Sequence, residues 1–239
     1  MKLEELRHRL ADAIRGSRFQ QVSFFVGGCV RDELLQRTIP LLDADLAVAL
    51  PRGGIALAQF LAQKLGLAEP EIHPSFGTAK LDLFGLTLEF VMTREELYRP
   101  GNRFPRVRYA DLSKDCKRRD FTVNALYQNI ADGSILDPCE RGLPDLEKRL
   151  IRSIRDPYLS FREDPLRILR ALRFAAVLDF ELEPQTWQAL CELAPLVQNL
   201  SSQRLEEEKQ RLKITANPEQ LQRWQSLAQS CGASTLVPI

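Results

Sequence analysis

Residues 22–50 read VSFFVGGCVRDELLQRTIPLLDADLAVAL, and the succession of residue types in this stretch decides the fold. The run Val22–Val26 is apolar, β-branched and aromatic and stops at two glycines, which predicts a buried strand that ends in a tight turn. The spacing of apolar residues over Val30–Arg37 predicts a helix, and the apolar run Leu41–Leu50 predicts a second strand. A strand, a helix and a second strand in succession favour a mixed sheet with helices beside it.

The rest of the chain divides into a mixed front part and a helical back part. The front part is expected to add helices over residues 3–15 and 55–66, a hairpin over residues 78–84 and 86–92, and an irregular Arg-rich segment over residues 95–112. From about residue 120 the pattern becomes helical, interrupted by turn-like pairs at 132–133 and 137–138. After residue 165 it is nearly all helical to about residue 230. We therefore expect a soft boundary near residue 145, with no flexible linker.

Composition argues against several classes of protein. The 239 residues carry 33 Lys and Arg against 32 Asp and Glu, so with a net charge of +1 any basic surface must be local. No apolar run reaches the roughly 20 residues of a membrane span, and the N-terminus lacks an apolar signal core. We expect a cytoplasmic protein with no membrane partner. The cysteines are scattered along the chain, and His8 and His73 are the only histidines. Both facts argue against a zinc site, and the first argues against a disulfide scaffold.

Asp43 and Asp45 place two acids inside the second expected strand. Residues two apart in a strand point to the same face, so the two carboxylates project side by side. In apolar surroundings they repel one another and lose hydration, and a divalent cation that prefers oxygen ligands compensates both effects. Mg²⁺ held by two carboxylates and substrate phosphates suits phosphoryl or nucleotidyl transfer. The alternative is that one acid caps a turn and the other is exposed.

The glycine turn upstream of the acids offers a place for phosphates. Gly27 and Gly28 let the backbone approach a phosphate closely, and N–H donors at the start of a helix favour an anion. Arg31 adds a guanidinium fork that suits phosphate oxygens. Together with the acid pair this turn predicts a triphosphate cradle that faces a metal, whereas alone it is an ordinary tight turn.

Two clusters of arginines stand later in the chain. Arg118-Arg119 precedes an apolar segment, where a solvated basic turn is the plain alternative. Arg167, Arg170 and Arg173 recur every third residue among Leu, Ile and Phe side chains, behind Asp164-Pro165, which suits the start of a helix. A row of guanidiniums on so apolar a helix needs anions or buried carboxylates opposite it.

The stretches that carry these features stand in a characteristic order. They are GGCVRDELL (27–35) with DAD (43–45), RRDFTVNAL (118–126), DPCERGLPDL (137–146) and EDPLRILRALRFA (163–175). Together they closely resemble the class II tRNA nucleotidyltransferase and poly(A) polymerase family, and LSSQRLEEE (200–208) is similar to that family's helical motif after the nucleotide site. The resemblance covers about residues 20–225.

The resemblance implies an α+β fold in two parts. Residues 1–145 would form a nucleotidyltransferase-type head, a mixed β-sheet with flanking helices. Residues 146–239 would form an all-helical neck that recognises the nucleotide base, with the start of a truncated body. Family members usually continue into further helical body and tail regions, whereas this chain stops soon after Trp224, as a truncated or a natural short form.

The resemblance also implies roles for individual residues. Asp43 and Asp45 would hold the catalytic Mg²⁺. Glu89 is a candidate third acidic group, with a salt-bridged strand residue as the equal alternative. The candidate nucleotide-binding residues are Gly28, Arg31, Arg118, Arg119, Asp164, Arg167, Arg170 and Arg173. Of these, Gly28, Arg31 and one arginine of the Arg118-Arg119 pair would meet the triphosphate. Arg170 and Arg173 would complete the phosphate and ribose contacts.

Asp164 and Arg167 form the pair that would read the base. Cytosine and adenine each present an amino donor and a ring acceptor on the pairing edge, which a carboxylate beside a guanidinium complements. Uracil places an acceptor where the Asp needs a donor, and guanine places a donor where the Arg needs an acceptor. This pair would therefore select CTP and ATP without a nucleic-acid template, since an unpaired buried polar group is strongly rejected.

The expected activity is addition of CMP, AMP or both to the 3′ end of tRNA, by attack of the RNA 3′-hydroxyl on the α-phosphate of CTP or ATP. A poly(A) polymerase and a non-catalytic nucleotide- or RNA-binding remnant are the alternatives. Two details depart from the family: Gln36 replaces a usual glycine, and the interval from Asp32 to Asp43 is about two residues longer. Residues 74–80 lack the Gly-Arg-Arg-Phe-like stretch usual in poly(A) polymerases, which favours CCA-end synthesis or repair. Arg99–Arg108 falls near the loop that governs whether CCA, CC or A is added, with RNA contact or a solvated loop as alternatives.

Overall fold

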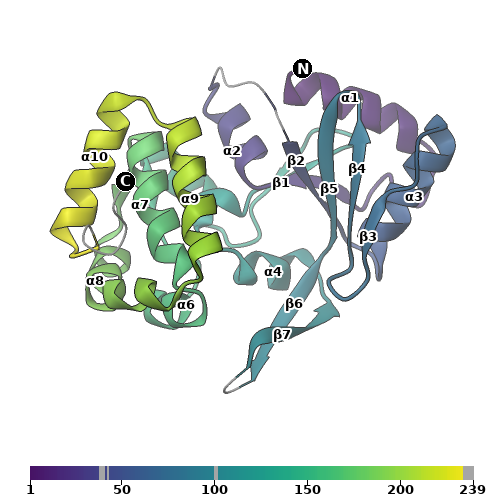
Figure 1. Ribbon diagram of the computed structural model, residues 1–239. Helices are drawn as coiled ribbons and strands as arrows, with labels where there is room; N and C mark the ends of the chain where they lie inside the picture. Colours follow the sequence, from purple (N-terminus) through teal and green to yellow (C-terminus); the bar gives the residue numbers. More distant parts are fainter. Residues whose placement is uncertain (38–40, 42, 100–101, 234–239) are drawn as a thin grey trace. The chain divides into compact units, whose positions relative to one another are not determined.

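The computed structural model describes residues 1–37, 41, 43–99 and 102–233. The chain separates into two compact units (Figure 1). Unit 1 contains Met1–Arg119 and Asn124–Gly142, and unit 2 contains Asp120–Val123 and Leu143–Ile239. Among the described residues, no helix combines the length and the apolar character needed to cross a membrane.

Unit 1 is built on a mixed sheet of seven strands within the described residues. In spatial order they are β3 (Glu71–His73), β4 (Thr78–Leu83), β5 (Leu86–Met92), β2 (Asp43–Val48), β1 (Ser23–Val26), β8 (Tyr127–Asn129) and β9 (Ile135–Leu136). The pairing of β2 with β5 is parallel, and the other neighbours are antiparallel. The expected α+β fold class is confirmed.

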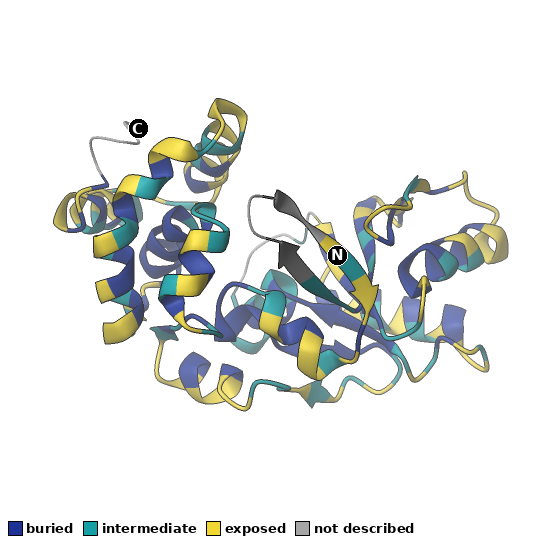
Figure 2. Ribbon diagram, turned by 90° about the horizontal axis from the view of Figure 1, so that it is seen from below, coloured by how far each residue is buried: buried dark blue, intermediate teal, exposed yellow. Residues whose placement is uncertain are grey.

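Side chains alternate between the two faces of this sheet. In β2, Ala44, Leu46 and Val48 are buried, whereas Asp43 and Asp45 are exposed. The same alternation in β5 buries Leu88 and Phe90 and leaves Thr87 exposed, as expected for a sheet with one covered face. Figure 2 shows the buried residues gathered along the strands, with exposed residues on the outer faces of the helices.

Helices cover the buried face of the sheet. They are α1 (Leu3–Ile14), α2 (Gly28–Leu34) and α3 (Gly53–Leu65), whereas the short α4 (Leu112–Asp115) contacts strand β6 (Arg94–Arg99). Helix α3 packs on β2, β4 and β5, and α1 packs on α2 and α3 through buried residues such as Leu6 and Leu10. The helices predicted over residues 3–15 and 55–66 and the β4–β5 hairpin are confirmed.

Two expectations for the middle of the chain are wrong. Residues 95–112 are not irregular, because β6 (Arg94–Arg99) and β7 (Asn102–Tyr109) form an antiparallel hairpin whose tip, residues 100–101, lies outside the described residues. Directly after residue 120 the chain forms one 3₁₀ turn (Thr122–Asn124) and the short strands β8 and β9 rather than a helix. The apolar run at residues 121–127 is buried throughout, and periodicity alone does not separate such a strand from a helix.

Unit 2 is helical, as the pattern after residue 165 predicts. Its helices are α5 (Gly142–Glu147, whose first residue belongs to unit 1), α6 (Pro157–Glu163), α7 (Leu166–Leu178), α8 (Pro184–Leu193), α9 (Ser202–Thr215) and α10 (Pro218–Ser230). A short parallel pair, β10 (Leu150–Ile151) with β11 (Glu181–Leu182), and a 3₁₀ helix (Ala194–Asn199) accompany them. Helix α7 is buried along most of its length and packs against α6, α9 and α10.

Gly54→Ala tests the close contact of α3 with the sheet. A Cβ atom at this position would lie 2.7 Å from the carbonyl oxygen of Phe90 and 2.9 Å from the backbone nitrogen of Met92, and neither backbone atom can move without disturbing the sheet. We expect the free energy of unfolding to fall by about 3 kcal/mol in urea denaturation.

Gly66→Ala is the matched control. Gly66 has a φ of +64°, and a Cβ atom on it would meet nothing within 4 Å, so only the backbone conformation is penalised, by about 1 kcal/mol. Equal losses for the two variants would contradict the tight packing of α3.

Candidate active site

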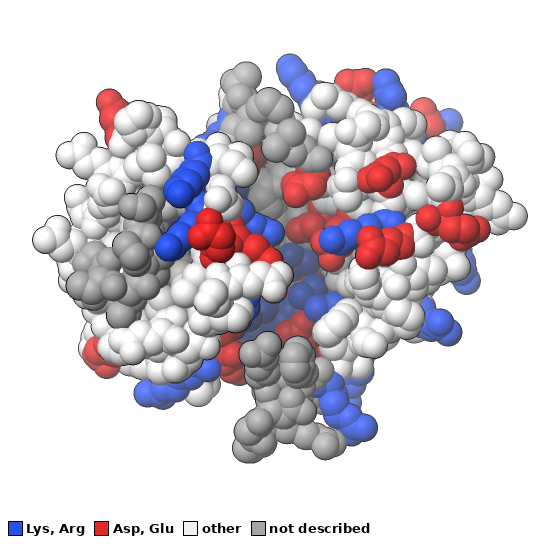
Figure 3. All heavy atoms as spheres, viewed as in Figure 1, with Lys and Arg blue, Asp and Glu red and all other residues white. Residues whose placement is uncertain are grey.

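Asp43 and Asp45 lie on one face of β2, as the strand alternation predicts. Both are exposed, so the expected apolar surroundings are wrong, and what brings the two acids together is strand geometry rather than burial. In the sheet register Asp45 stands opposite Glu89 of β5 on one side and Val26 of β1 on the other. Acidic side chains gather over β2, β4 and β5 in Figure 3.

The glycine bend after β1 lies against this acid pair. Gly27 has a φ of +88°, a conformation that glycine adopts without strain, and a Cβ atom on it would lie 3.6 Å from Oδ2 of Asp45. Burial raises the pKa of the Cys29 thiol to about 12, and the charge of Asp45 adds to the effect. The bend at residues 27–29 and the acids at residues 43–45 therefore occupy one place in unit 1.

Arg31 is buried beside the same bend. A Cβ atom on Gly28 would lie 3.4 Å from its guanidinium, so Gly28 and Arg31 are neighbours, as expected. Its Nε and Nη2 donate to the carboxylate of Asp32 at 3.0 and 2.9 Å, and Nη1 donates to Oδ1 of Asn124 at 2.6 Å. Asp32 and Asn124 thereby set the direction of the guanidinium.

Arg118 and Arg119 share one buried carboxylate, that of Asp115, which sequence reasoning missed. Nε of Arg118 donates to Oδ1 at 2.9 Å, and Arg119 lies 3.3 Å from Oδ2. The hydroxyl of Tyr127 donates to Oδ2 at 2.6 Å, and the backbone N–H of Arg94 donates to Oδ1 at 2.8 Å. Because Arg118 and Arg119 both bind this buried carboxylate, they do not form a solvated basic turn.

Arg119 is electrostatically coupled to the acid pair. Burial acts to lower the pKa of the guanidinium, but the Tyr127 hydroxyl and the carboxylates of Asp115 and Asp45 outweigh it, and the pKa of Arg119 lies above its ordinary value. The charge of Asp45, one of the two acids on β2, therefore acts on the guanidinium of Arg119.

The acid pair fits a hard divalent cation. Among the described residues no group of three or more His, Cys, Asp and Glu side chains is arranged to hold a metal by itself. Two carboxylates on an open face suit Mg²⁺, which keeps several water ligands and is usually held by one or two carboxylates together with substrate phosphates. Asp43 and Asp45 supply that donor set, and Glu89 lies beside Asp45 in the register.

In unit 2, Asp164 and Arg167 lie at the start of α7. Pro165 occupies the N-cap position of α7, one residue later than expected, and Oδ1 of Asp164 accepts the backbone N–H of Leu166 at 3.2 Å. The same oxygen accepts from Nη2 of Arg204 at 2.9 Å. Arg167 is buried, and its Nη1 donates to the hydroxyl of Ser160 at 2.7 Å. The LSSQRLEEE stretch (200–208) thus contributes directly to this corner of unit 2.

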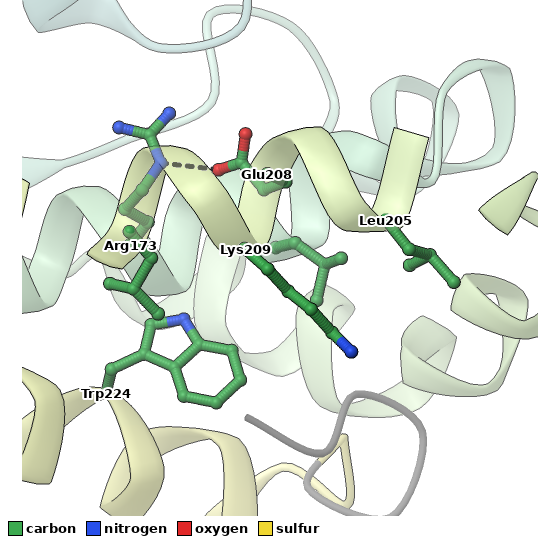
Figure 4. Close-up of a pocket in the computed structure, with 7 residues that line it drawn as sticks. Arg173, Leu205, Glu208, Lys209 and Trp224 are labelled. Carbon is green, nitrogen blue, oxygen red and sulfur yellow. Dashed lines mark hydrogen bonds and ion pairs between the residues drawn. The ribbon is translucent and has the colours of Figure 1, made fainter. Parts of the chain in front are cut away.

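Arg170 and Arg173 have carboxylates opposite them, one of the two outcomes the sequence allows. Arg170 donates to Oδ2 of Asp120 through Nε at 2.8 Å, and Nε of Arg173 donates to Oε1 of Glu208 at 2.5 Å. Figure 4 shows the second pair, with Trp224 beside Arg173 at the pocket that both line. Both guanidiniums also lie over the Phe174 ring.

The residues that bind these arginines were not predicted from the sequence. Asp115, Tyr127 and Asn124 were not singled out, since an acid or an amide in a mixed segment carries no periodic signal. The only sequence hint is that Asp115 stands three residues before Arg118, a spacing that favours side-chain pairing across one turn of helix.

Comparison with known families agrees with this arrangement. A family described as "Poly A polymerase head domain" matches residues 23–152, which include the acid pair, the glycine bend and both Arg118 and Arg119. A second, described as "Probable RNA and SrmB- binding site of polymerase A", matches residues 179–222 of unit 2.

Individual relatives and structures give the same picture. The A-adding tRNA nucleotidyltransferase of Aquifex aeolicus is 43% identical over 173 residues, which are 70% of this chain and 20% of that protein. The CCA-adding enzyme of Bacillus stearothermophilus in complex with CTP has a TM-score of 0.77 at 28% identity, covering 100% of this chain and 55% of its own.

A further solved structure is a tRNA nucleotidyltransferase complexed with a primer tRNA and an incoming ATP analog. It has a TM-score of 0.73 at 29% identity and covers 98% of this chain and 62% of its own. The chain therefore spans between a fifth and about three fifths of the length of these proteins. The matched motifs, the fold and the identities show that this chain belongs to the class II CCA-adding enzyme and poly(A) polymerase family, with its head domain and the RNA-binding region that follows.

Proposed function

We propose that this protein adds CMP, AMP or both to the 3′ end of tRNA, taking CTP and ATP and releasing pyrophosphate. The observation that carries the proposal is the meeting of the Gly27 bend with the Asp45 carboxylate, 3.6 Å from a Cβ atom on the glycine, on the strand that also exposes Asp43. The named relatives and structures, which add A or CCA or hold CTP or tRNA with an ATP analog, support the substrates. The cytoplasm is the compartment we propose.

In this reaction Asp43 and Asp45 would hold Mg²⁺. The bound cation would neutralise phosphate charge and favour loss of the proton from the attacking hydroxyl. Arg118 and Arg119 would bind the triphosphate, and the glycine bend with Arg31 would let the phosphates approach the backbone. The RNA 3′-hydroxyl attacks the α-phosphate in line, the bond to the β-phosphate breaks, and pyrophosphate leaves.

The choice of nucleotide is assigned to unit 2. Asp164 would accept the amino group of cytosine or adenine, and Arg167 would donate to the neighbouring ring acceptor. The hydrogen bonds to Asp164 described above both go to Oδ1, and Arg204 and the helix start hold that oxygen in place. Arg170 and Arg173 would extend the contacts to ribose and phosphate. Residues 1–145 would thus act as the catalytic head and residues 146–239 as the base-reading neck.

Asp45→Asn and Asp43→Asn are expected to lower kcat for extension of a tRNA that lacks its 3′ end by on the order of 10²–10³-fold, because the carboxylate charge that suits the cation is lost. Asp82→Asn is the matched control, since Asp82 is an exposed acid on β4, which β5 separates from β2. Labelled CTP or ATP is followed on gels, and chelation of divalent cations should abolish extension by the unaltered chain. Equal activity of the variants and the control would refute the assignment.

Asp164→Ala is expected to lower the preference for CTP and ATP over UTP and GTP by on the order of 10²-fold, because the acceptor that rejects the wrong pairing edge is removed. The measurement is incorporation with all four nucleoside triphosphates. Asp156→Ala is the control, since Asp156 also accepts a backbone N–H at the start of a helix of unit 2, that of Leu159. Unchanged selectivity in Asp164→Ala, or the same loss in Asp156→Ala, would remove the proposed reading role.

A further inference from the structure

The Asp115 cluster, made of Asp115, Arg118, Arg119 and Tyr127, has a layered arrangement within unit 1. The side chain of Asp115 is 0% exposed, whereas those of Arg118 and Arg119 are 17% and 14% exposed. The carboxylate therefore lies beneath two guanidiniums whose outer parts reach the surface. Glu96 lies 3.8 Å from Arg118 and 2.9 Å from Arg94. Three arginines therefore stand against the two carboxylates of Asp115 and Glu96, so the net charge stays positive.

Each oxygen of Asp115 accepts from two groups. Oδ1 accepts the backbone N–H of Arg94 and Nε of Arg118, and Oδ2 accepts the Tyr127 hydroxyl and Nε of Arg119. A buried carboxylate that is fully satisfied in this way has a single orientation. Burial would raise its pKa, but the two guanidiniums outweigh burial and hold the pKa of Asp115 at about 2, so that it stays ionised throughout the neutral range.

Tyr127 binds both Arg119 and Asp115 through its hydroxyl group. Its hydroxyl donates to Asp115 at 2.6 Å and accepts from Nε of Arg119 at 3.0 Å, while its ring packs edge-on against Phe24 of β1. Burial raises the pKa of Tyr127 above its ordinary value, so the hydroxyl keeps its proton. The guanidinium of Arg119 is thus tied by two groups that stand on different elements, α4 and β8.

We propose that Asp115 and Tyr127 are positioning residues, which hold Arg118 and Arg119 in the orientation that receives the triphosphate of the incoming nucleotide. This inference rests on the proposed function, because it names what directs the arginines assigned there to the phosphates. Arg118 and Arg119 share the carboxylate of Asp115, and Arg118 also lies 3.8 Å from Oε1 of Glu96. The charge of Asp45 acts on Arg119 as well.

In Asp115→Asn, the loss of the negative charge and the loss of the arginines' orientation are expected to change KM in opposite directions. Loss of a negative charge beneath the arginines would by itself strengthen triphosphate binding and lower KM. The amide of asparagine keeps one acceptor oxygen and replaces the other with an NH₂ donor, so the two guanidiniums are no longer both held, which raises KM. We expect orientation to prevail and KM for CTP and ATP to rise about tenfold, with kcat within about twofold, since charge-assisted hydrogen bonds are lost.

Tyr127→Phe is the second variant, because it keeps the ring packing and every charge. The loss of one hydroxyl is expected to raise KM about threefold at unchanged kcat. Tyr109→Phe is the matched control: Tyr109 is exposed and its hydroxyl donates to the carbonyl of Ala49, away from the cluster, so its KM should not change. Thermal melting of each variant shows whether it is folded, and Tyr127→Phe decides the question if Asp115→Asn does not fold.

A double-mutant cycle separates positioning from general disturbance. If Tyr127 acts through Arg119, Tyr127→Phe raises KM in the unaltered chain and has no further effect in an Arg119→Ala background. Equal effects in both backgrounds, or unchanged KM in Asp115→Asn and Tyr127→Phe with the unaltered chain active, would overturn the inference.

Failure of the proposed function gives a different result. In that case the unaltered chain extends no tRNA, and calorimetric titration with inorganic tripolyphosphate then tests the cluster directly. Weaker binding in Tyr127→Phe than in Tyr109→Phe would support the positioning role even without transferase activity, and equal binding would overturn it.

Discussion

A β-strand turns every second side chain to the same side, and unit 1 depends on this constraint. In β2 this alternation places Leu46 and Val48 in the core beneath α3, and it places Asp43 and Asp45 on the open face. Because β2 runs parallel to β5 in register, Glu89 follows onto that face beside Asp45. The acids need no apolar pocket to bring them together, since the buried half of the same strand holds them in place.

A second constraint comes from the buried and half-buried arginines, which need hydrogen-bond acceptors. Desolvating a guanidinium costs free energy unless an acceptor faces it, and each candidate arginine of the nucleotide site has one. The pairs are Arg31 with Asp32 and Asn124, Arg118 and Arg119 with Asp115, Arg167 with Ser160, Arg170 with Asp120, and Arg173 with Glu208. A partner of this kind also directs the cation, so the same contact can stabilise the fold and orient a group toward phosphate.

Elements with a single clear period were predictable from the sequence. The alternation in residues 78–92 and the 3.6-residue spacing in α1 and α3 specify their class, because one face of each is covered by the core. The β6–β7 hairpin was not predictable in the same way. Its strands carry Arg and Glu on both faces, so they show no hydrophobic alternation. The segment around Phe121 is buried on every side, its polar residues Asp120, Thr122 and Asn124 included, so it shows no alternation between a covered and an exposed face.

By itself, the sequence determined which residue types could serve the site: two acids one residue apart on a strand, a glycine turn before them, and arginines grouped at 118–119 and 167–173. These are local patterns, and local geometry is enough to interpret them. Only the tertiary structure decided which group each arginine meets. Arg31 meets Asn124 across 93 residues, Arg170 meets Asp120 across 50, and Arg204 meets Asp164 across 40. Such pairs depend on sheet register and helix packing, which bring together residues that no short-range period relates.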